Sequence, residues 1–407
     1  MDHIFQSQIA TIKSSKVENN KLYLSITITK KLVLFYFDLL KHVQIKIKTE
    51  EYLIDQPGKY HIFFSVNRKE TTINLEIVRV NNFTLTPEIL QDVIRSIKVY
   101  EYGNPIVVSD KKYQIMYSFD KNYYSGASAS IVSLIKSFCP DKLDELYLNI
   151  CIEKDDLPSF IRLIKKLKTE IVFDYSLYIL NKTLLDDNIL KTTCFKGGNH
   201  LLKLANFNRL ICGHIINCKH LLYLDSDTII QKDLSSVLDK ITDDDYIIMG
   251  KKSHLTVGNL LNVNNIEHAS SYIGNNIKKS IIYTGTLIIN PVRFRKYYSK
   301  MIELIKTHNN LEKKGGLYKL FTMSIINISL LQDIQYFDNI LNNVVDLGCK
   351  PDIETKMIES ADVLDWSGLY KPWYNNGMYR EYWKKYDLLY KEYNDVTTNK
   401  NTVESFS

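Results

Sequence analysis

The chain has 407 residues, of which 45% are hydrophobic and 24% charged. This composition is typical of a globular protein with one large domain or two ordinary ones, and two are expected. The net charge of +6 is small for this length and Lys and Arg form no long block, which argues against a nucleic-acid-binding protein.

The start of the chain, MDHIFQSQIA, lacks the basic flank and apolar core of a secretion signal. The apolar run LVLFYFDLL is too short to cross a bilayer and contains Asp38, so no transmembrane segment is expected. The six cysteines form no CxxC pair and no zinc spacing, which suits reduced thiols. Heavy use of Tyr, Ile, Lys and Asn fits an AT-rich genome, such as that of a large DNA virus or a protist. We therefore expect a cytoplasmic protein, in the host cytoplasm or the virion if it is viral.

Residues 1–85 are expected to form a β-rich accessory domain. Six short alternating stretches there are separated by turn-prone runs such as VENN, DQPGK and NRKE, a pattern typical of a small sandwich or barrel. A helical linker is expected over 86–110, because Thr86 can cap a helix and Pro87 suits its first position. Packing and assembly, including a homodimer, are the expected roles of the accessory domain, with glycan binding as the alternative.

From residue 111 the pattern changes to alternating strands and helices, and 111–385 is expected to be one α/β domain. Predicted strands cover 113–119, 146–153, 170–175 and 220–225, and predicted helices cover 124–138, 157–168 and 200–216. This alternation implies parallel strands covered by helices, and in such sheets ligands collect at the carboxyl ends of the strands. The polar tail over 386–407 is expected to be mobile.

Two aspartates, Asp225 and Asp227, end the apolar strand in the run HLLYLDSDTII. Residues i and i+2 of a strand point to the same side, and two carboxylates about 5 Å apart repel by roughly 3 kcal/mol at an effective dielectric of 20. A cation between them, or protonation of one, would relieve this repulsion. Because no Cys or His is nearby, the expected ion is Mg²⁺ or Mn²⁺, which usually shares its coordination with substrate phosphates.

Two other interpretations of this pair are open. Asp225 can cap a turn or a helix while Asp227 is solvated, and the pattern DxD is short and common. An aspartyl phosphatase of the haloacid-dehalogenase type also begins with a strand followed by DxD. Its signature, however, has Thr or Val where this chain has Ile229, and it normally lies near the start of the catalytic domain, whereas this pair lies about 115 residues into it.

Four separated blocks between about 113 and 385 resemble, in order, glycosyltransferase family 8, whose members have the GT-A fold. The first block, YSFDKNYYSGASASIVSLIKS, is similar to the family's opening strand and nucleotide-binding turn. The resemblance implies that the uracil and ribose are held by Ser118, Asp120, Asn122 and Tyr123. The second block, ANFNRL, leads into the DxD strand and implies that Arg209 reaches a phosphate or the donor sugar.

The third block, IIYTGTLIINPVRFRK, resembles the family's strand F-N-A-G-V-L-L-I-N. It implies that Thr284 and Gly285 belong to the donor site, where a glycine permits close approach of the sugar to the backbone. Ser226, between the two aspartates, is assigned to the same site. Tyr283 stands where the family has Asn, so contacts with the donor sugar are expected to differ from those of the family.

After a helix, the run LLQDIQYFDNIL resembles the family's D-Q-D-x-L-N. The resemblance implies that Gln332 and Asp333 neighbour the anomeric carbon. Leu331 stands where the family has its first Asp, which puts one contact with a sugar hydroxyl in question.

The last block, LDWSGLYKPWY, resembles H-x-x-G-x-x-K-P-W and matches it at Gly368, Lys371, Pro372 and Trp373. The metal-binding His of the family is Asp365 here. Because aspartate is also a hard oxygen ligand, the implied metal ligands are Asp225, Asp227 and Asp365, with a weakened metal site as the alternative.

The resemblance implies a retaining, metal-dependent hexosyltransferase that takes glucose or galactose from a UDP-sugar and uses Mn²⁺ or Mg²⁺. The cation and Lys371 would neutralise the departing diphosphate. Same-face substitution is favoured over a covalent intermediate because Gln332 is a poor nucleophile; Gln332 and Asp333 would then position an oxocarbenium-like centre. The acceptor would be a hydroxyl of a glycan or of a glycosylated protein, with a collagen-like protein as one candidate. A catalytically inactive protein that binds a nucleotide sugar or a glycan is the alternative.

Overall fold

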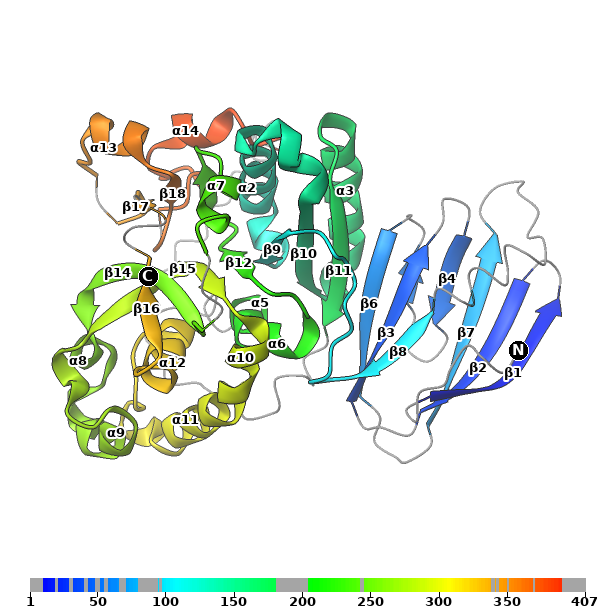
Figure 1. Ribbon diagram of the computed structural model, residues 1–407, viewed down its shortest axis with the longest axis horizontal. Helices are drawn as coiled ribbons and strands as arrows, with labels where there is room; N and C mark the ends of the chain where they lie inside the picture. The colour runs from blue at the N-terminus through cyan, green and yellow to red at the C-terminus, as the bar shows by residue number, and fades with distance from the viewer. Residues whose placement is uncertain are drawn as a thin grey trace.

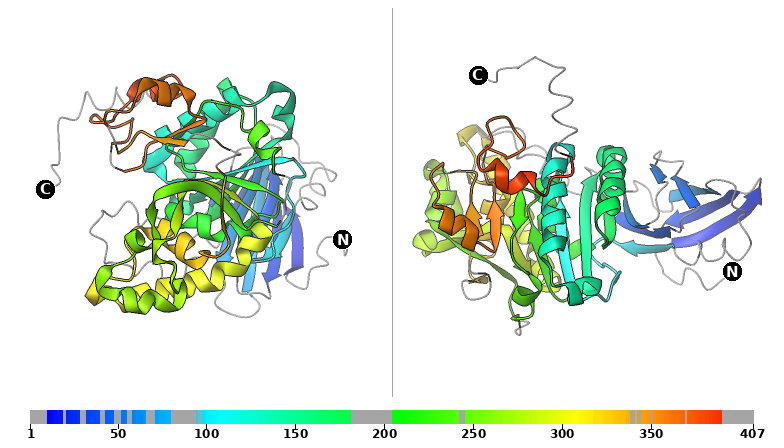
Figure 2. Two further views of the ribbon diagram at one scale, coloured as in Figure 1. Left: turned by 60° about the vertical axis from the view of Figure 1, so that its left-hand side comes forward. Right: turned by 90° about the horizontal axis from the view of Figure 1, so that it is seen from above.

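The computed structural model describes residues 10–18, 21–28, 32–39, 43–47, 52–54, 58–65, 71–79, 94, 97–180, 204–241, 245–337, 341, 344–349, 351–368 and 370–389. Figure 1 shows an α/β body and a group of N-terminal strands that extends from one side of it. The view from above in Figure 2 shows the same elongated arrangement.

Ten strands form the central sheet, in the order β16-β14-β15-β12-β9-β10-β11-β6-β3-β8. Strands β12, β9, β10 and β11 run parallel, and β15 is antiparallel to β12. The bounds are β3 Leu32–Leu39, β6 Gly58–Ser65, β8 Lys98–Glu101, β9 Tyr113–Ser118, β10 Leu146–Glu153, β11 Asp174–Leu180, β12 Leu221–Leu224, β14 Ile248–Thr256, β15 Ser280–Ile289 and β16 Ile334–Tyr336. The mixed sheet with flanking helices confirms the predicted α/β class.

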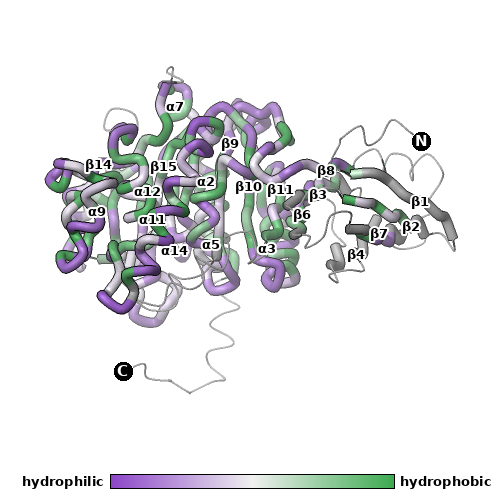
Figure 3. Tube along the Cα trace, turned by 90° about the horizontal axis from the view of Figure 1, so that it is seen from below, coloured by the Kyte–Doolittle hydropathy of each residue, from purple (hydrophilic) through white to green (hydrophobic). Residues whose placement is uncertain are grey.

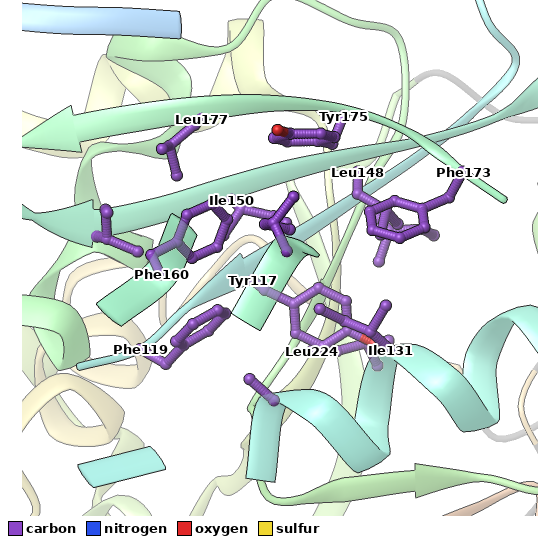
Figure 4. Packing of buried hydrophobic residues seen from close by; sticks show 14 of the residues in the cluster. Tyr117, Phe119, Ile131, Leu148, Ile150, Phe160, Phe173, Tyr175, Leu177 and Leu224 are labelled. Carbon is purple, nitrogen blue, oxygen red and sulfur yellow. The ribbon is translucent and has the colours of Figure 1, made fainter. Parts of the chain in front are cut away.

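Alternate residues of β9 face opposite sides of the sheet, which gives the body two apolar cores. Ile115 and Tyr117 belong to the first core, together with residues of helices α2 (Tyr124–Ser137) and α3 (Leu157–Glu170); Figure 4 shows Tyr117 beside Ile131 of α2. Met116 belongs to the second core, with α11 (Tyr298–Asn310) and α12 (Phe321–Ser329). Figure 3 shows hydrophobic and hydrophilic stretches alternating along the helices and strands of the body.

The remaining helices are short. The α-helices are α5 Leu204–Phe207, α6 Cys212–Ile215, α7 Ser235–Leu238, α8 Val257–Leu260, α9 Ile266–Ile273, α10 Pro291–Phe294, α13 Thr355–Ser360 and α14 Arg380–Lys384. The 3₁₀ helices are η1 Lys121–Tyr123, η2 Pro140–Glu145, η3 Lys154–Asp156, η6 Asn208–Ile211, η7 Val263–Asn265, η8 Asn276–Lys278, η9 Arg295–Tyr297 and η10 Glu312–Lys314. Within the described residues, no helix combines the length and the apolar character needed to cross a membrane.

Helix α2 begins with small residues because it lies directly against the turn that carries the two aspartates. A Cβ atom on Gly126 would lie 2.6 Å from the carbonyl oxygen of Ser226 and 3.0 Å from two ring atoms of Trp373. Any side chain at this position would therefore displace either the turn or the tryptophan. The run YSGASAS thus allows the helix to support the end of β12.

A small third sheet, in the order β13-β18-β17, completes this region. Its strands are β13 Thr228–Ile230, β17 Val344–Asp346 and β18 Val363–Asp365. Strand β13 follows the aspartate turn immediately and pairs with β18, so that Thr228 lies opposite Asp365. This pairing brings the last block of the sequence to the end of β12.

The N-terminal strands continue the central sheet. Strand β6 pairs in parallel with β11, from Lys59 opposite Ser176 to Ile62 opposite Ile179. A separate five-stranded antiparallel sheet has the order β1-β2-β7-β4-β5, with bounds β1 Ala10–Glu18, β2 Lys21–Ile28, β4 Val43–Ile47, β5 Tyr52–Ile54 and β7 Thr71–Arg79. The N-terminal region is thus rich in strands, and the domain boundary at residue 85 stays a prediction.

Two predicted segments differ from the structure. Residues Lys98–Glu101 form strand β8, although the helical linker was expected to extend through 110; residues 86–93 of that linker lie outside the described residues. The tail expected to be mobile from 386 begins with packed residues, since Asp387 and Leu389 are buried and Ser125 donates a hydrogen bond to Asp387. The rest of the tail, 390–407, lies outside the described residues.

Candidate active site

A pocket of about 180 Å³ lies at the carboxyl ends of β9 and β12. Its lining combines segments that are far apart in the sequence and includes both aspartates of the DxD run. Of the residues that the sequence assigned to the site, those lining the pocket are Ser118, Asp120, Tyr123, Arg209, Asp225, Ser226, Asp227, Gly368 and Lys371. The strand ends therefore meet at one place, as expected for a sheet of this kind.

Asp225 is held by a buried arginine. Arg209 donates from Nη2 to Asp225 Oδ1 at 2.7 Å and from Nη1 to the carbonyl oxygen of Thr284 at 2.8 Å. The hydroxyl of Tyr223 donates to the same Oδ1 at 2.7 Å. Burial raises the pKa of Asp225, while the Arg209 charge acts in the opposite direction. Asp225 is thus fixed in one orientation, with its backbone N–H donating to Gly285 O at 2.8 Å.

Asp227 has a different cationic partner. Lys371 Nζ donates to Asp227 Oδ2 and to the carbonyl oxygen of Trp366, and Lys371 and Asp227 are 5% and 7% exposed. Burial alone would lower the pKa of Lys371, but the charge and hydrogen bond of Asp227, together with the neighbouring Tyr123 and Asp365, raise the pKa above its usual value. The lysine therefore stays charged in the pocket.

The two aspartates lie on the turn between β12 and β13, not within one strand as the sequence suggested. Each carboxylate has a cation of its own, Arg209 for Asp225 and Lys371 for Asp227. The repulsion expected between them is thus relieved in this structure by two side chains.

Asp365 lies behind the pocket wall and is 1% exposed. The hydroxyl of Tyr283, which does line the pocket, donates to Asp365 Oδ1 at 2.7 Å. Asp365 Oδ2 is buried and has no hydrogen-bond partner among the residues that the structure describes. Burial, followed by the charges of Asp227 and other nearby aspartates, raises the pKa of Asp365 well above its usual value.

The other side of the pocket carries the opening strand and η1. Ser118 donates to the carbonyl oxygen of Ala205 at 2.8 Å, and Asp120 caps η1 by accepting from the N–H of Asn122 at 2.8 Å. The ring of Tyr123 meets Trp373 edge-on, with 5.4 Å between ring centroids. Lys371 Nζ lies 5.6 Å from the centroid of the same ring, so an aromatic surface adjoins the charged centre.

A comparison with known protein families identifies the family of this chain. The family model "Glycosyl transferase family 8" matches residues 114–377, which contain every residue of the pocket. The chain belongs to glycosyl transferase family 8. The resemblance seen in the sequence is thereby confirmed, and the phosphatase alternative is set aside.

Solved structures with similar folds are glycosyltransferases. The bifunctional glycosyltransferase WbbM aligns with 86% of this chain and 69% of its own at a TM-score of 0.54 and 13% identity. The galactosyltransferase LgtC covers 72% of this chain and 98% of its own (TM-score 0.44, 16% identity). GlyE of Streptococcus pneumoniae covers 72% and 66% (TM-score 0.44, 17% identity). The fold is that of the GT-A glycosyltransferases. A search of curated proteins gives no match.

Besides Asp365, five residues assigned from the family resemblance do not line the pocket. Asn122 is exposed on η1, and Thr284 and Gly285 contact Arg209 and Asp225 through their carbonyl oxygens. Gln332 is exposed, and Asp333 accepts a hydrogen bond from Tyr297 at 2.8 Å. The structure therefore does not bring Gln332 and Asp333 to the pocket, and their expected place beside the anomeric carbon stays a prediction without support from the geometry.

Five further residues line the pocket but were not predicted from the sequence. They are Phe119, Ala205, Asn206, Tyr283 and Ser367. Asn206 matters most, because its Oδ1 accepts from Arg209 Nη2 at 2.8 Å and from Thr322 at 3.2 Å. A signal was present: Asn206 precedes Arg209 by three residues, a spacing that places two side chains on one face of a helical segment. Tyr283 had been noticed only as a departure from the family pattern.

The donor set fits a divalent cation. Carboxylate oxygens are the ligands that Mg²⁺ and Mn²⁺ prefer, and a Cβ atom on Gly285 would lie 2.7 Å from Asp365 Oδ2 and 3.2 Å from Asp225 Oδ2. These two oxygens thus face one small space, and one of them is buried without a partner. The described side chains form no group of three or more His, Cys, Asp or Glu that could hold a metal ion in their present conformations. Metal binding therefore stays a prediction.

Proposed function

We propose that this family 8 glycosyltransferase moves a hexose, glucose or galactose, from a UDP-sugar to a hydroxyl of a glycan or of a glycosylated protein. The observation that carries the proposal is the charged centre of the pocket, where Arg209 and Lys371 face the aspartates at the end of β12. A buried lysine at the carboxyl ends of parallel strands suits a ligand with a diphosphate group.

Lys371 is the residue we assign to the leaving group. Transfer from a nucleotide sugar releases a diphosphate, and negative charge develops on its bridging oxygen as the glycosidic bond breaks. A preorganised cation in a site that excludes water stabilises such charge strongly. Lys371 is held by Asp227 and by the Trp366 carbonyl, so little reorganisation is needed when the diphosphate departs.

We also propose that the reaction depends on Mn²⁺ or Mg²⁺. Asp225, Asp227 and Asp365 would hold the ion, and when bound it would supply a Lewis acid for the diphosphate oxygens. The nucleoside is assigned to the side of the pocket formed by Ser118, Asp120 and Tyr123, where the tyrosine ring offers a surface for the base.

Retention at the anomeric carbon, by same-face substitution, is the proposed stereochemical course. The two aspartates of the DxD turn are engaged with Arg209 and Lys371, which disfavours either as a covalent nucleophile. Gln332 and Asp333 lie outside the pocket, so the proposal assigns them no step. The departing phosphate would then accept the proton of the acceptor hydroxyl.

Donor hydrolysis tests the proposal. A transferase slowly hydrolyses its donor with water, so UDP release from UDP-glucose and UDP-galactose is measured with Mn²⁺ or Mg²⁺ and with EDTA. We expect release from one donor only with metal, and at least a hundredfold loss in Asp227→Asn. Release of UDP that is equally fast in wild type and in Asp227→Asn would refute the assignment of the site.

A second function is supported by one observation. Gln332 and Asp333, the residues that the family resemblance placed at the anomeric carbon, do not line the pocket. A chain that binds UDP-sugars without cleaving them would account for this. The same assay separates the two functions, because a binding protein retains UDP affinity in calorimetry and releases no UDP from either donor.

The proposals about the acceptor, the oligomeric state and the cellular compartment rest on the sequence alone. A collagen-like acceptor, a homodimer formed through the N-terminal strands, a viral origin and a cytoplasmic location stay predictions. Product analysis with glycosylated peptides, and sedimentation of the full chain, would test the first two.

A further inference from the structure

Tyr283 and Asp365 are in direct contact. By the resemblance described above, Tyr283 takes the place of an Asn and Asp365 that of a His. The Tyr283 hydroxyl donates to Asp365 Oδ1 at 2.7 Å. Tyr283 comes from β15 and Asp365 from β18, so this hydrogen bond links the central sheet to the small third sheet.

This hydrogen bond determines where the second oxygen of Asp365 points. With Oδ1 held by Tyr283, Oδ2 lies on the Gly285 side, where a Cβ atom would come within 2.7 Å of it. The same Cβ position is 3.2 Å from Asp225 Oδ2 and 2.8 Å from the ring of Tyr283. Gly285 therefore leaves open the small space that both carboxylates face.

Asp365 Oδ2 is not satisfied by any described residue. This oxygen is buried and has no donor within hydrogen-bond distance among them. A buried polar atom without a partner is unfavourable, and a cation bound to Oδ2 would supply the missing partner.

The cationic side chains around this space are already engaged. Arg209 pairs with Asp225, and Lys371 pairs with Asp227. Asp365 accepts a hydrogen bond from the Tyr283 hydroxyl through Oδ1, and its Oδ2 has no partner among the described residues. Asp365 Oδ2 is thus the oxygen available to a bound cation.

We propose that the Tyr283 hydroxyl is a positioning group for Asp365, and that the pair makes the small space beside Gly285, at the wall of the pocket, an all-carboxylate site that binds Mg²⁺ and Mn²⁺ with similar affinity. The inference rests on the proposed function, since the ion is the one that would accompany the nucleotide. Imidazole favours later transition metals, whereas carboxylates suit Mg²⁺, Ca²⁺ and Mn²⁺. A site made of carboxylates alone therefore lacks the type of ligand that discriminates against Mg²⁺.

The test measures metal binding directly. Mn²⁺ is titrated into the full chain with UDP present and followed by electron paramagnetic resonance, and Mg²⁺ is then added as a competitor. In wild type we expect the two dissociation constants to lie within about tenfold of each other. In Tyr283→Phe both ions should bind about 10–100-fold more weakly with their ratio unchanged, as is usual when a group that orients a ligand is lost.

Tyr297→Phe is the matched control, because it removes another tyrosine hydroxyl that donates to an aspartate, Asp333, away from the pocket. Its metal affinity should equal that of wild type. Asp365→His, alone and with Tyr283→Asn, should raise the preference for Mn²⁺ over Mg²⁺ at least about tenfold. Thermal unfolding in EDTA identifies the variants that fold. Asp365→Asn has a side chain of nearly the same shape but no carboxylate, so it should also bind Mn²⁺ more weakly than wild type.

Equal Mn²⁺ affinity in Tyr283→Phe and Tyr297→Phe would overturn the inference, as would an unchanged Mn²⁺/Mg²⁺ ratio in both variants that contain Asp365→His. UDP affinity in EDTA, measured by calorimetry, distinguishes this failure from that of the proposed function. A wild-type chain that binds UDP but no Mn²⁺ contradicts this inference and leaves sugar transfer standing. A chain that binds neither contradicts both.

Discussion

Lys371 and Asp227 form an ion pair in the wall of the pocket, and each residue is more than nine-tenths buried. Lys371 also donates to the Trp366 carbonyl, which belongs to the segment just after β18. The pair therefore joins the aspartate turn to the segment LDWSGLYKPWY, so that one lysine both links two parts of the fold and lines the pocket.

Removing one partner of this pair should lower the free energy of unfolding more than removing both partners. Lys371→Met leaves Asp227 buried without its cation, and loss of one partner of a buried pair typically lowers the free energy of unfolding by about 3–5 kcal/mol. The double variant Asp227→Asn with Lys371→Met should recover most of that loss, because no uncompensated charge remains. Urea unfolding in EDTA measures both.

Activity should separate from stability in the same variants. We expect UDP release to fall at least about a hundredfold in Lys371→Met and to stay low in the double variant although its stability recovers. If the double variant regained activity together with stability, Lys371 would have only a structural role.

Gly126 should tolerate no side chain. In Gly126→Ala the new Cβ would lie 2.6 Å from the Ser226 carbonyl oxygen, a backbone atom that cannot move without moving the aspartate turn. We expect a loss of about 1–3 kcal/mol in the free energy of unfolding and weaker UDP binding. Gly258→Ala is the control: its closest contact is 3.1 Å, to a side-chain atom of Ile277. Wild-type UDP affinity in Gly126→Ala would show that the turn does not position the nucleotide.

Stability should depend on pH through His61, which is buried where β6 joins β11. Its Nδ1 lies 2.7 Å from the Tyr100 hydroxyl oxygen and its ring stacks on Tyr178. Burial, and then the charge of Lys59, lowers the pKa of His61 to about 3. Below the unfolded pKa of about 6.5 the unfolded chain binds a proton that the native chain does not. The free energy of unfolding should therefore fall as the pH drops from 6.5 toward 3, by up to about 1.4 kcal/mol per pH unit for this group.

Urea unfolding at pH 7, 6 and 5 checks this contribution. The free energy of unfolding should decrease less across this range in His61→Gln than in wild type. The difference in slope should correspond to about one proton taken up on unfolding. His254→Gln, at an exposed position, should keep the wild-type dependence. The same pH dependence in His61→Gln and wild type would mean that His61 is not a neutral buried group.

Local patterns in the sequence were enough to predict much of the body and part of the site. The apolar runs at 113–119, 146–153 and 220–225 each contain a strand of the parallel sheet. Because such strands end at one edge, Asp225 and Asp227 could be placed in a pocket before any contact was known. Lys371 could be placed there only through the family pattern.

Other features depend on tertiary contacts that no short motif contains. Gln332 and Asp333 match the family's D-Q-D-x-L-N pattern in residue type. In the structure they follow the end of α12, where Asp333 contacts Tyr297 and does not line the pocket. The junction of β6 with β11 joins segments more than 100 residues apart, and alternation within each strand does not specify its partner. The hydrogen bond from Tyr283 to Asp365 likewise links two separate sheets.

The most direct test of the account is a crystal structure of the chain soaked with UDP and Mn²⁺. The account predicts the diphosphate beside Lys371 in this pocket, with the metal ion in contact with carboxylates of the aspartate group. A nucleotide bound elsewhere on the chain, or a pocket that stays empty at saturating UDP and Mn²⁺, would contradict it.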